Sequence, residues 1–185
     1  MHLMDGPFSE SLAGQLVLAG GAVVGVGGVA VGLWRMDFER LPRVGLLTSA
    51  FFVASLILLP LPPTSVHPLL LGLMGLLLGW AVFPALLVGL LLQFVFFQHG
   101  GLTTLGLNTA NFGLAALVGA GWLHRPLAAC RKPWIAFVIG LAAGSVPVLL
   151  AAGLVTAELM AIGRAFRTVA ELVLVAHVPV ALGEG

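Results

Sequence analysis

Long apolar stretches, separated by short polar or proline-containing segments, make up most of the chain. The longest is a run of 31 residues at 68–98. One helix of that length would reach about 45 Å, whereas the hydrocarbon core of a bilayer is about 30 Å thick. Trp80 and Pro84 lie in the middle of this run, so two short helices are predicted there. The full set of predicted helices is 12–33, 44–61, 68–79, 81–98, 106–123, 134–155 and 158–182.

Composition supports a membrane interpretation of these stretches. The chain is 60% hydrophobic and 8% charged, whereas a soluble domain carries about 25% charged residues. Residues 44–123 contain no Asp, Glu, Lys or Arg. The predicted fold class is an all-α polytopic integral membrane protein with about seven helical segments. A single membrane domain is predicted over 1–185, and its first ten residues, 1–10, are predicted to be an N-terminal metal-binding segment.

The first predicted helix contains two pairs of glycines spaced four residues apart, Gly21/Gly25 and Gly28/Gly32. Such spacing allows the backbone of another helix to approach closely, and this partner could belong to the same chain or to another subunit. The glycine run lacks the Gly-Lys-Ser/Thr ending of a phosphate-binding loop. No ATP-binding motif occurs elsewhere, so active transport would draw its energy from a partner protein.

Basic residues favour one orientation in the membrane. They cluster after the first predicted helix and again before 134–155, and cytoplasmic loops are enriched in Lys and Arg. The clusters are Arg35, Arg40 and Arg43, then Arg125, Arg131 and Lys132. With both clusters in the cytoplasm, the N-terminus, His67 and the loop 98–104 are predicted on the outer side. Arg164 and Arg167 do not fit this scheme.

The N-terminal pair Met1-His2 is a potential chelator. A free amine, the amide nitrogen of His2 and its imidazole can close two fused rings on one metal ion. A second imidazole would complete a plane of four nitrogens, which suits Ni(II) and Cu(II). His67, predicted in an outer loop, is the best placed histidine for that position. Taken alone, a Met-His start arises by chance in many proteins, and His67 could equally be a solvated interfacial residue.

Other polar residues could orient the ligands without binding the ion. The candidates are Asp5, Ser65, His99, Asn108 and Asn111. Hydrogen bonds to metal-bound histidines fix their tautomer and ring orientation. Polar side chains in membrane helices also bond one helix to another, so either role is open for the two asparagines. His124 is interpreted as structural, and the role of His177 is left open.

Three stretches resemble a known family. They are the N-terminal Met-His-Leu-Met-Asp-Gly, the segment Thr64-Ser65-Val66-His67 with the apolar run after it, and Gln98-His99-Gly100-Gly101-Leu102-Thr103-Thr104 continuing to Asn111. A weaker fourth match is His177 to Gly185. In this order they resemble the substrate-binding S components, of the CbiM/NikM type, of energy-coupling-factor transporters for cobalt and nickel.

The resemblance implies a bundle of six helices with an extra N-terminal helix that brings the chain start into the site. It implies a metal ion held by Met1, His2 and His67. The implied partners are a transmembrane T component, a pair of cytosolic ATPases and a small N-type membrane subunit, and the chain itself would lie in the lipid bilayer of the cell membrane. The Thr-Ser-Val-His form is nearer to the nickel members than to the cobalt members.

The sequence therefore predicts a transporter subunit that captures Ni²⁺, or Co²⁺, from the outer side. The two alternatives are a membrane-embedded metal-dependent enzyme with His67 and His99 as ligands, and a structural membrane protein without a ligand. An enzyme would need a general base, and no Asp or Glu lies near these histidines in the sequence. The net charge of +1 gives no indication of nucleic-acid binding.

Overall fold

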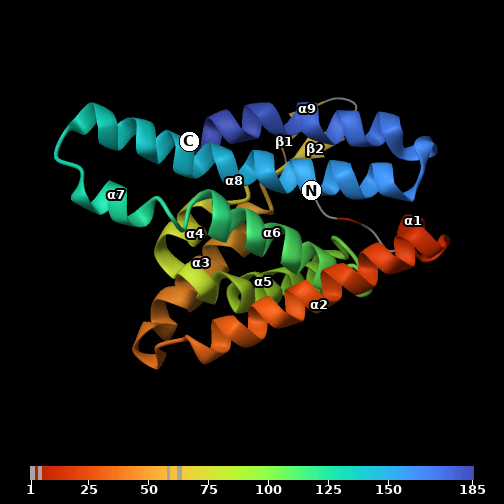
Figure 1. Cartoon of the computed structure of the whole chain (residues 1–185), viewed down its shortest axis with the longest axis horizontal. Helices are drawn as coiled ribbons and strands as arrows, with labels where there is room; N and C mark the ends of the chain where they lie inside the picture. Colours follow the sequence, from red (N-terminus) through yellow and green to blue (C-terminus); the bar gives the residue numbers. More distant parts are fainter. Residues whose placement is uncertain (1–2, 4–5, 58, 62–63) are drawn as a thin grey trace.

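The computed structural model describes residues 3, 6–57, 59–61 and 64–185 (Figure 1). Its longer helices are α2 (Leu12–Trp34), α3 (Leu41–Ala54), α4 (Leu71–Leu78), α5 (Val82–Phe97), α6 (Leu105–Gly119), α8 (Pro133–Ile162) and α9 (Arg167–Glu184). The shorter elements are α1 (Gly6–Ser9), α7 (His124–Ala129), the 3-10 turns η1 (Phe38–Arg40), η2 (Gly79–Ala81) and η3 (Arg164–Phe166), and the strands β1 (Leu59–Leu61) and β2 (Thr64–Val66). The predicted all-α class is confirmed, with one small hairpin added.

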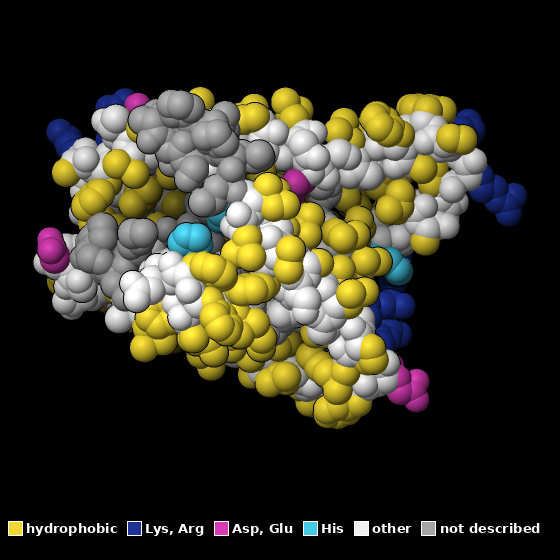
Figure 2. Space-filling view, turned by 180° about the vertical axis from the view of Figure 1, so that it is seen from behind, with side chains coloured by type: hydrophobic (Ala, Val, Ile, Leu, Met, Phe, Trp, Pro, Cys, Tyr) yellow, Lys and Arg dark blue, Asp and Glu magenta, His cyan; other side chains and the backbone are white. Residues whose placement is uncertain are grey.

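The outer surface is that of a membrane protein. Within the described residues, four helical stretches are long and apolar enough to cross a bilayer: Leu12–Trp34, Leu71–Phe97, Pro133–Ile162 and Arg164–Glu184. Apolar side chains cover much of the face seen in Figure 2. Val23 and Val26 on α2 and Phe96 on α5 are among the large side chains that point outward. A continuous apolar surface of this kind is matched by lipid and not by water.

Helix α6 forms the centre of the bundle. Most of its residues are buried, and α2, α4, α5 and α8 all pack against it. Helices α8 and α9 lie side by side, joined by a tight connection at Gly163 and η3 (Figure 1). The side chains of the main core, such as Phe51, Phe83 and Phe112, are almost completely buried.

The paired glycines of α2 pack inside the chain. A side chain at Gly21 would collide with Leu107, and one at Gly25 would collide with the Gly106 carbonyl oxygen of α6. Gly28 faces the ring of Phe83 in the same way. The small residues therefore bring α2 against α6 and α5, so that the partner left open by the sequence is internal. This packing fixes the position from which the N-terminal segment leaves the bundle.

The long apolar run breaks where Trp80 and Pro84 indicated. Helix α4 ends at Leu78, and Gly79 adopts φ 53° and ψ −126° before the turn η2. A positive φ is readily adopted by glycine because it has no Cβ. Helix α4 has eight residues, which corresponds to about 12 Å. It is therefore too short to cross a bilayer core by itself.

Two predicted helix boundaries were wrong. The helix expected at 44–61 ends at Ala54, where the Ser55 hydroxyl donates to the Phe52 carbonyl at 2.6 Å. The chain then forms the antiparallel hairpin β1–β2, in which Pro60 pairs with Ser65. A proline in the interior of a helix removes a backbone donor and clashes with the preceding turn, so Pro60 disfavours continuation of this helix.

The boundary between the last two predicted helices, at 155–158, was also wrong. Helix α8 continues to Ile162, and the turn follows at Gly163. No Gly or Pro lies between Gly153 and Gly163, so nothing stops the helix earlier. Glu158 therefore belongs to α8 and not to the last helix. Pro147, inside α8, is accommodated because it packs against Gly119 of α6.

Candidate metal-capture site

His67 lies between strand β2 and helix α4 and is almost completely buried, with 4% of its surface exposed. Its Nδ1 is 3.1 Å from the carbonyl oxygen of Pro68. A carbonyl can only accept, so this contact places the proton on Nδ1 and the lone pair on Nε2. A backbone partner of this kind fixes the tautomer and orientation of metal-binding histidines.

Burial also sets the charge of His67. It lowers the pKa of His67 from 6.5 to about 3, and the nearby imidazoles of His177 and His99 act in the same direction. The ring is therefore neutral at pH 7. Neutral imidazole is the form that binds transition metals. The two imidazoles come from separate parts of the chain.

Two of these histidines come from elements far away in the sequence. His99 is half-buried in the loop after α5, with its ring centroid 6.1 Å from that of Phe97. That loop turns sharply, because Gln98 and Gly100 have φ of 54° and 81°. His177, on α9, is buried with 3% of its surface exposed. Figure 2 shows histidine side chains left of the middle of the face and a further histidine at the right edge, close to basic side chains.

The loop that carries His67 is held by the C-terminal helix. The carboxylate of Glu184, in the last turn of α9, accepts a hydrogen bond from the Leu69 backbone N–H. Helix α9 also packs on β2, the strand that leads into His67. Leu69 lies just before the N-terminus of α4, where the helix dipole favours a negative charge. Helix α9 therefore contacts the chain on both sides of His67.

A second group of contacts anchors the start of the chain. The side chain of Asn108 accepts from the Leu3 N–H at 3.1 Å and donates to the Leu3 carbonyl at 3.2 Å. The Thr104 hydroxyl donates to the same carbonyl at 2.7 Å. Leu3 itself is buried in a cluster with Phe8 and Leu107. Both backbone groups of Leu3 are therefore satisfied by α6 and the residue before it.

The other predicted site residues are placed less directly. Asn111 donates to Glu158 at 2.8 Å, so its described contact joins α6 to α8. Met1, His2 and Asp5 lie outside the described residues, and of Ser65 only the backbone in β2 is described. No group of three or more His, Cys, Asp or Glu side chains able to hold a metal occurs among the residues that the structure describes.

Comparison with known proteins identifies the family. The family model for the cobalt uptake substrate-specific transmembrane region, CbiM, matches residues 2–185. The chain belongs to the CbiM family. Its similarity to a curated metal transport protein extends over nearly its whole length: 41% identity with a putative metal transport protein of Haemophilus influenzae, covering 97% of this chain and 85% of that protein.

Other CbiM-family relatives carry nickel or cobalt in their names. A cobalt transport protein of Chlorobium limicola is 30% identical over 100% of this chain and 76% of its own length. A fused nickel transport protein of Rhodobacter capsulatus is 34% identical over 63% of this chain, which covers 36% of that larger protein. Membership of the family makes this chain a membrane component of cobalt or nickel uptake.

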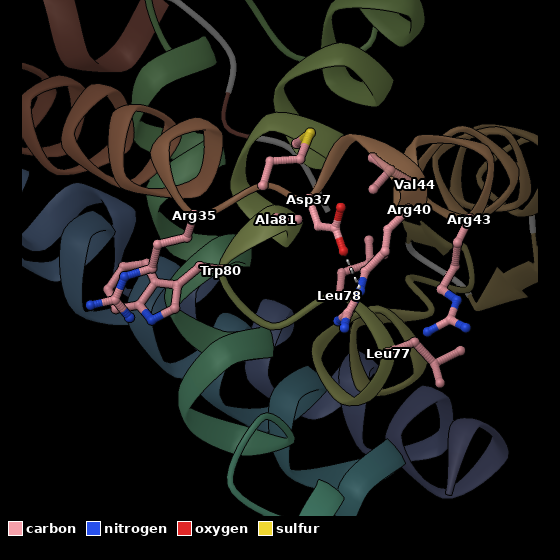
Figure 3. Close-up of a pocket in the computed structure, with 10 residues that line it drawn as sticks. Arg35, Asp37, Arg40, Arg43, Val44, Leu77, Leu78, Trp80 and Ala81 are labelled. Atoms are coloured by element: carbon pink, nitrogen blue, oxygen red, sulfur yellow. Dashed lines mark ion pairs between the residues drawn. The ribbon is translucent and has the colours of Figure 1, made fainter.

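A basic pocket lies beside the turn η1 (Figure 3). It has a volume of about 290 Å³ and is lined by the end of α2, η1, the start of α3 and the end of α4. Arg40 pairs with Asp37 at 3.4 Å, and the Arg35 guanidinium lies 5.3 Å from the centre of the Trp80 ring. Guanidinium groups stay protonated and do not bind metal ions. This pocket is therefore not the ion site of a CbiM-type protein.

Sequence analysis missed Glu184 and did not assign His177. A local signal existed for Glu184. A carboxylate in the last turn of a helix lies near the negative end of the helix dipole, which is unfavourable, so its presence there indicates a hydrogen-bond donor from another part of the chain. For His177 the signal was a titratable side chain within a membrane helix, which is expensive to bury without a function.

Proposed function

We propose that this protein captures a divalent transition-metal ion from the outer side of the membrane, with Ni²⁺ favoured over Co²⁺. It would act as the substrate-specific subunit of an ATP-driven energy-coupling-factor importer. The observation that carries the proposal is the neutral, buried imidazole of His67, whose tautomer presents the Nε2 lone pair. The family match and the nickel and cobalt names of its relatives support the same function.

The remaining ligands are proposed at the start of the chain. The amine of Met1 with the amide nitrogen and imidazole of His2 would supply three donors, and His67 would supply the fourth. Leu3 is two residues from Met1, and consecutive Cα atoms are 3.8 Å apart, so the amine stays within about 9 Å of the Leu3 Cα atom. The hydrogen bonds that Leu3 makes with Asn108 and Thr104 therefore limit how far these donors can move.

The donor set is the reason to favour nickel. Four nitrogens in one plane match the geometry that Ni(II) prefers, and imidazole is a suitable ligand for it. Co(II) has less to gain from a planar arrangement. The transported ion is the substrate of this protein, so it must bind tightly at the outer side and be released after a conformational step.

The partners follow from the proposed role. A transmembrane T component and a pair of cytosolic ATPases would supply the energy, and a small N-type membrane subunit would complete the importer. The basic end of the bundle with Arg35, Arg40 and Arg43 would face the cytoplasm, in line with the charge bias of membrane proteins. The N-terminus and His67 would then face outward.

The test compares metal content in three forms of the purified protein. The native form should bind about one Ni²⁺ per chain, since the proposed donors complete a single coordination plane. One glycine added before Met1 should abolish binding, because the terminal amine becomes an internal amide. His67→Ala should also abolish binding, and His124→Ala, at an exposed position on α7, should leave it unchanged. Equal metal in the native and extended forms would refute the chelate.

A further inference from the structure

The basic pocket beside η1 gathers positive charge from three separate parts of the fold. Arg35 directly follows α2, Arg40 ends η1 and Arg43 lies in the first turn of α3. In the view of Figure 3, Arg35 lies at one side of the pocket and Arg43 at the other, with Arg40 between them. Asp37 is the only acidic residue among the described lining residues, and the neighbouring Glu39 is exposed and does not line the pocket. Positive charge therefore exceeds negative charge in the pocket.

The described contacts neutralise little of this charge. Asp37 pairs with Arg40 at 3.4 Å, but both side chains are more than half exposed, and ion pairs between exposed side chains are weak. The Arg35 guanidinium lies 5.3 Å from the centre of the Trp80 ring, which orients the guanidinium and leaves its charge in place. Neither Arg35 nor Arg43 forms an ion pair within the part of the chain that the structure describes.

The chemistry of the lining favours a small anion with several oxygens. Guanidinium groups donate hydrogen bonds and accept none, and their fork of N–H groups matches the oxygens of a phosphate. The pocket volume of about 290 Å³ lies near the lower end of the range for small-molecule sites, which is about 300 Å³. The pocket therefore suits an anionic group, and not a large ligand.

The surroundings of the pocket indicate that this group belongs to a lipid. Helix α2 is long and apolar enough to cross a bilayer, and it ends one residue before Arg35. Trp34 and Phe38, on either side of the arginine, are 82% and 77% exposed, and Leu77 of the lining is also exposed. Aromatic side chains are enriched at the level of the headgroups. These apolar side chains can contact acyl chains, whereas a free phosphate ion would make no use of them.

We propose that this pocket binds the phosphate headgroup of an anionic phospholipid. Arg40 and Arg43 donate hydrogen bonds to the phosphate oxygens, Arg35 adds positive charge beside Trp80, and the acyl chains lie against the exposed apolar side chains. Basic pockets between membrane helices recognise anionic headgroups in this way. The site goes beyond the proposed metal capture and does not depend on His67. With the proposed orientation it faces the cytoplasmic leaflet, whose surface is negatively charged.

The test is native mass spectrometry of the full chain in detergent, titrated with phosphatidylglycerol or with phosphatidylcholine of the same acyl chains. One saturable phosphatidylglycerol per chain is expected, with phosphatidylcholine bound about tenfold more weakly or less. Replacing both Arg40→Gln and Arg43→Gln should weaken phosphatidylglycerol binding about tenfold or more. The matched control combines Arg125→Gln and Arg131→Gln, two exposed positions that do not line the pocket, and should stay within about twofold of the native affinity.

Four outcomes would overturn the lipid site. Equal binding of the two lipids by the native protein would do so without any variant. An equal loss in the two double variants would show that the charge of the whole chain, and not the pocket, attracts the lipid. Inorganic phosphate that displaces phosphatidylglycerol at similar concentrations would assign the pocket to the free ion. Binding of a polyglutamate peptide without binding of lipid would assign it to an acidic partner protein. Ni²⁺ binding should be the same in both double variants, so these outcomes are distinct from failure of the proposed function.

Discussion

The hydrogen bonds between Asn108 and Leu3 predict a specific effect on ion binding. Asn108→Ala removes the acceptor for the Leu3 N–H and one of the donors to the Leu3 carbonyl. The buried Leu3 N–H then loses its acceptor. The bond from the Thr104 hydroxyl remains, so the anchor is weakened without being removed.

The size of the loss in Ni²⁺ affinity can be worked out by comparing the entropy cost of ordering the N-terminal segment with the interactions that offset this cost. Ordering five residues costs about 5–10 kcal/mol, and burying the side chain of Leu3 returns only about 2–3 kcal/mol. The hydrogen bonds and the bound ion must supply the rest. Losing two hydrogen bonds and leaving one buried donor unpaired removes about 2–4 kcal/mol. Every 1.4 kcal/mol changes affinity tenfold, so the Ni²⁺ affinity should fall by roughly 30- to 1,000-fold.

The assay is competition for Ni²⁺ against a chelator of known affinity, with purified protein in lipid nanodiscs. Asn111→Ala is the matched control, because Asn111 lies on the same helix one turn away and bonds to Glu158 instead of Leu3. It should lower the thermal midpoint but leave the Ni²⁺ affinity within about twofold of the native value. Folded Asn108→Ala with native affinity, or an equal loss in Asn111→Ala, would refute the anchoring argument.

Three further predictions concern stability. Gly25→Ala should destabilise the protein by about 1–3 kcal/mol, as expected for overpacking, because the new Cβ would collide with the α6 backbone. Gly27→Ala should be neutral, because a Cβ at Gly27 would meet open space. Equal thermal midpoints for the two variants would contradict this prediction. Burial lowers the pKa of His67 to about 3 in the folded metal-free protein, so its contribution to the free energy of unfolding is present above pH 6.5 and is lost as pH falls toward 3. The thermal midpoint should therefore drop over that window, and it should drop less in His67→Gln. Parallel curves of thermal midpoint against pH for the two proteins would argue against this. Glu184→Ala should lower the free energy of unfolding by about 1–3 kcal/mol, because it leaves the Leu69 backbone N–H in the His67 loop unpaired. Glu171→Ala, at an exposed position, should have a smaller effect. Equal urea midpoints for the two variants would contradict a stabilising role for the Glu184–Leu69 hydrogen bond.

Local pattern was enough to predict many of the elements and insufficient for the boundaries. The apolar run at 12–33 and the break near Trp80 and Pro84 correspond closely to α2 and η2. The end of α3 and the extension of α8 to Ile162 were not predicted. Both segments are mostly apolar on either side of the point where the helix ends, so hydrophobicity changes little there. The stop depends on a hairpin partner for one helix and on a single glycine for the other.

For the candidate site, residue types were foreseeable and contacts were not. A histidine near the membrane surface and polar residues in membrane helices are visible in any sequence. Whether Asn108 orients a ligand or joins two helices could not be decided from its position. In the structure it bonds to Leu3, 105 residues away. The residues of the Glu184 contact with Leu69 are 115 positions apart.

The sequence by itself determined the class of this protein, because apolar composition and the absence of charge over 44–123 leave only a membrane environment as solvent. It also supplied the candidate donors, since the chemistry of an amine and an imidazole belongs to the residues. Only the tertiary structure decided that α6 holds Leu3 and that α9 brings Glu184 to the loop of His67. The physical reason is that hydropathy acts over a few neighbouring residues, whereas a capture site depends on directional contacts between segments that meet only after the helices pack.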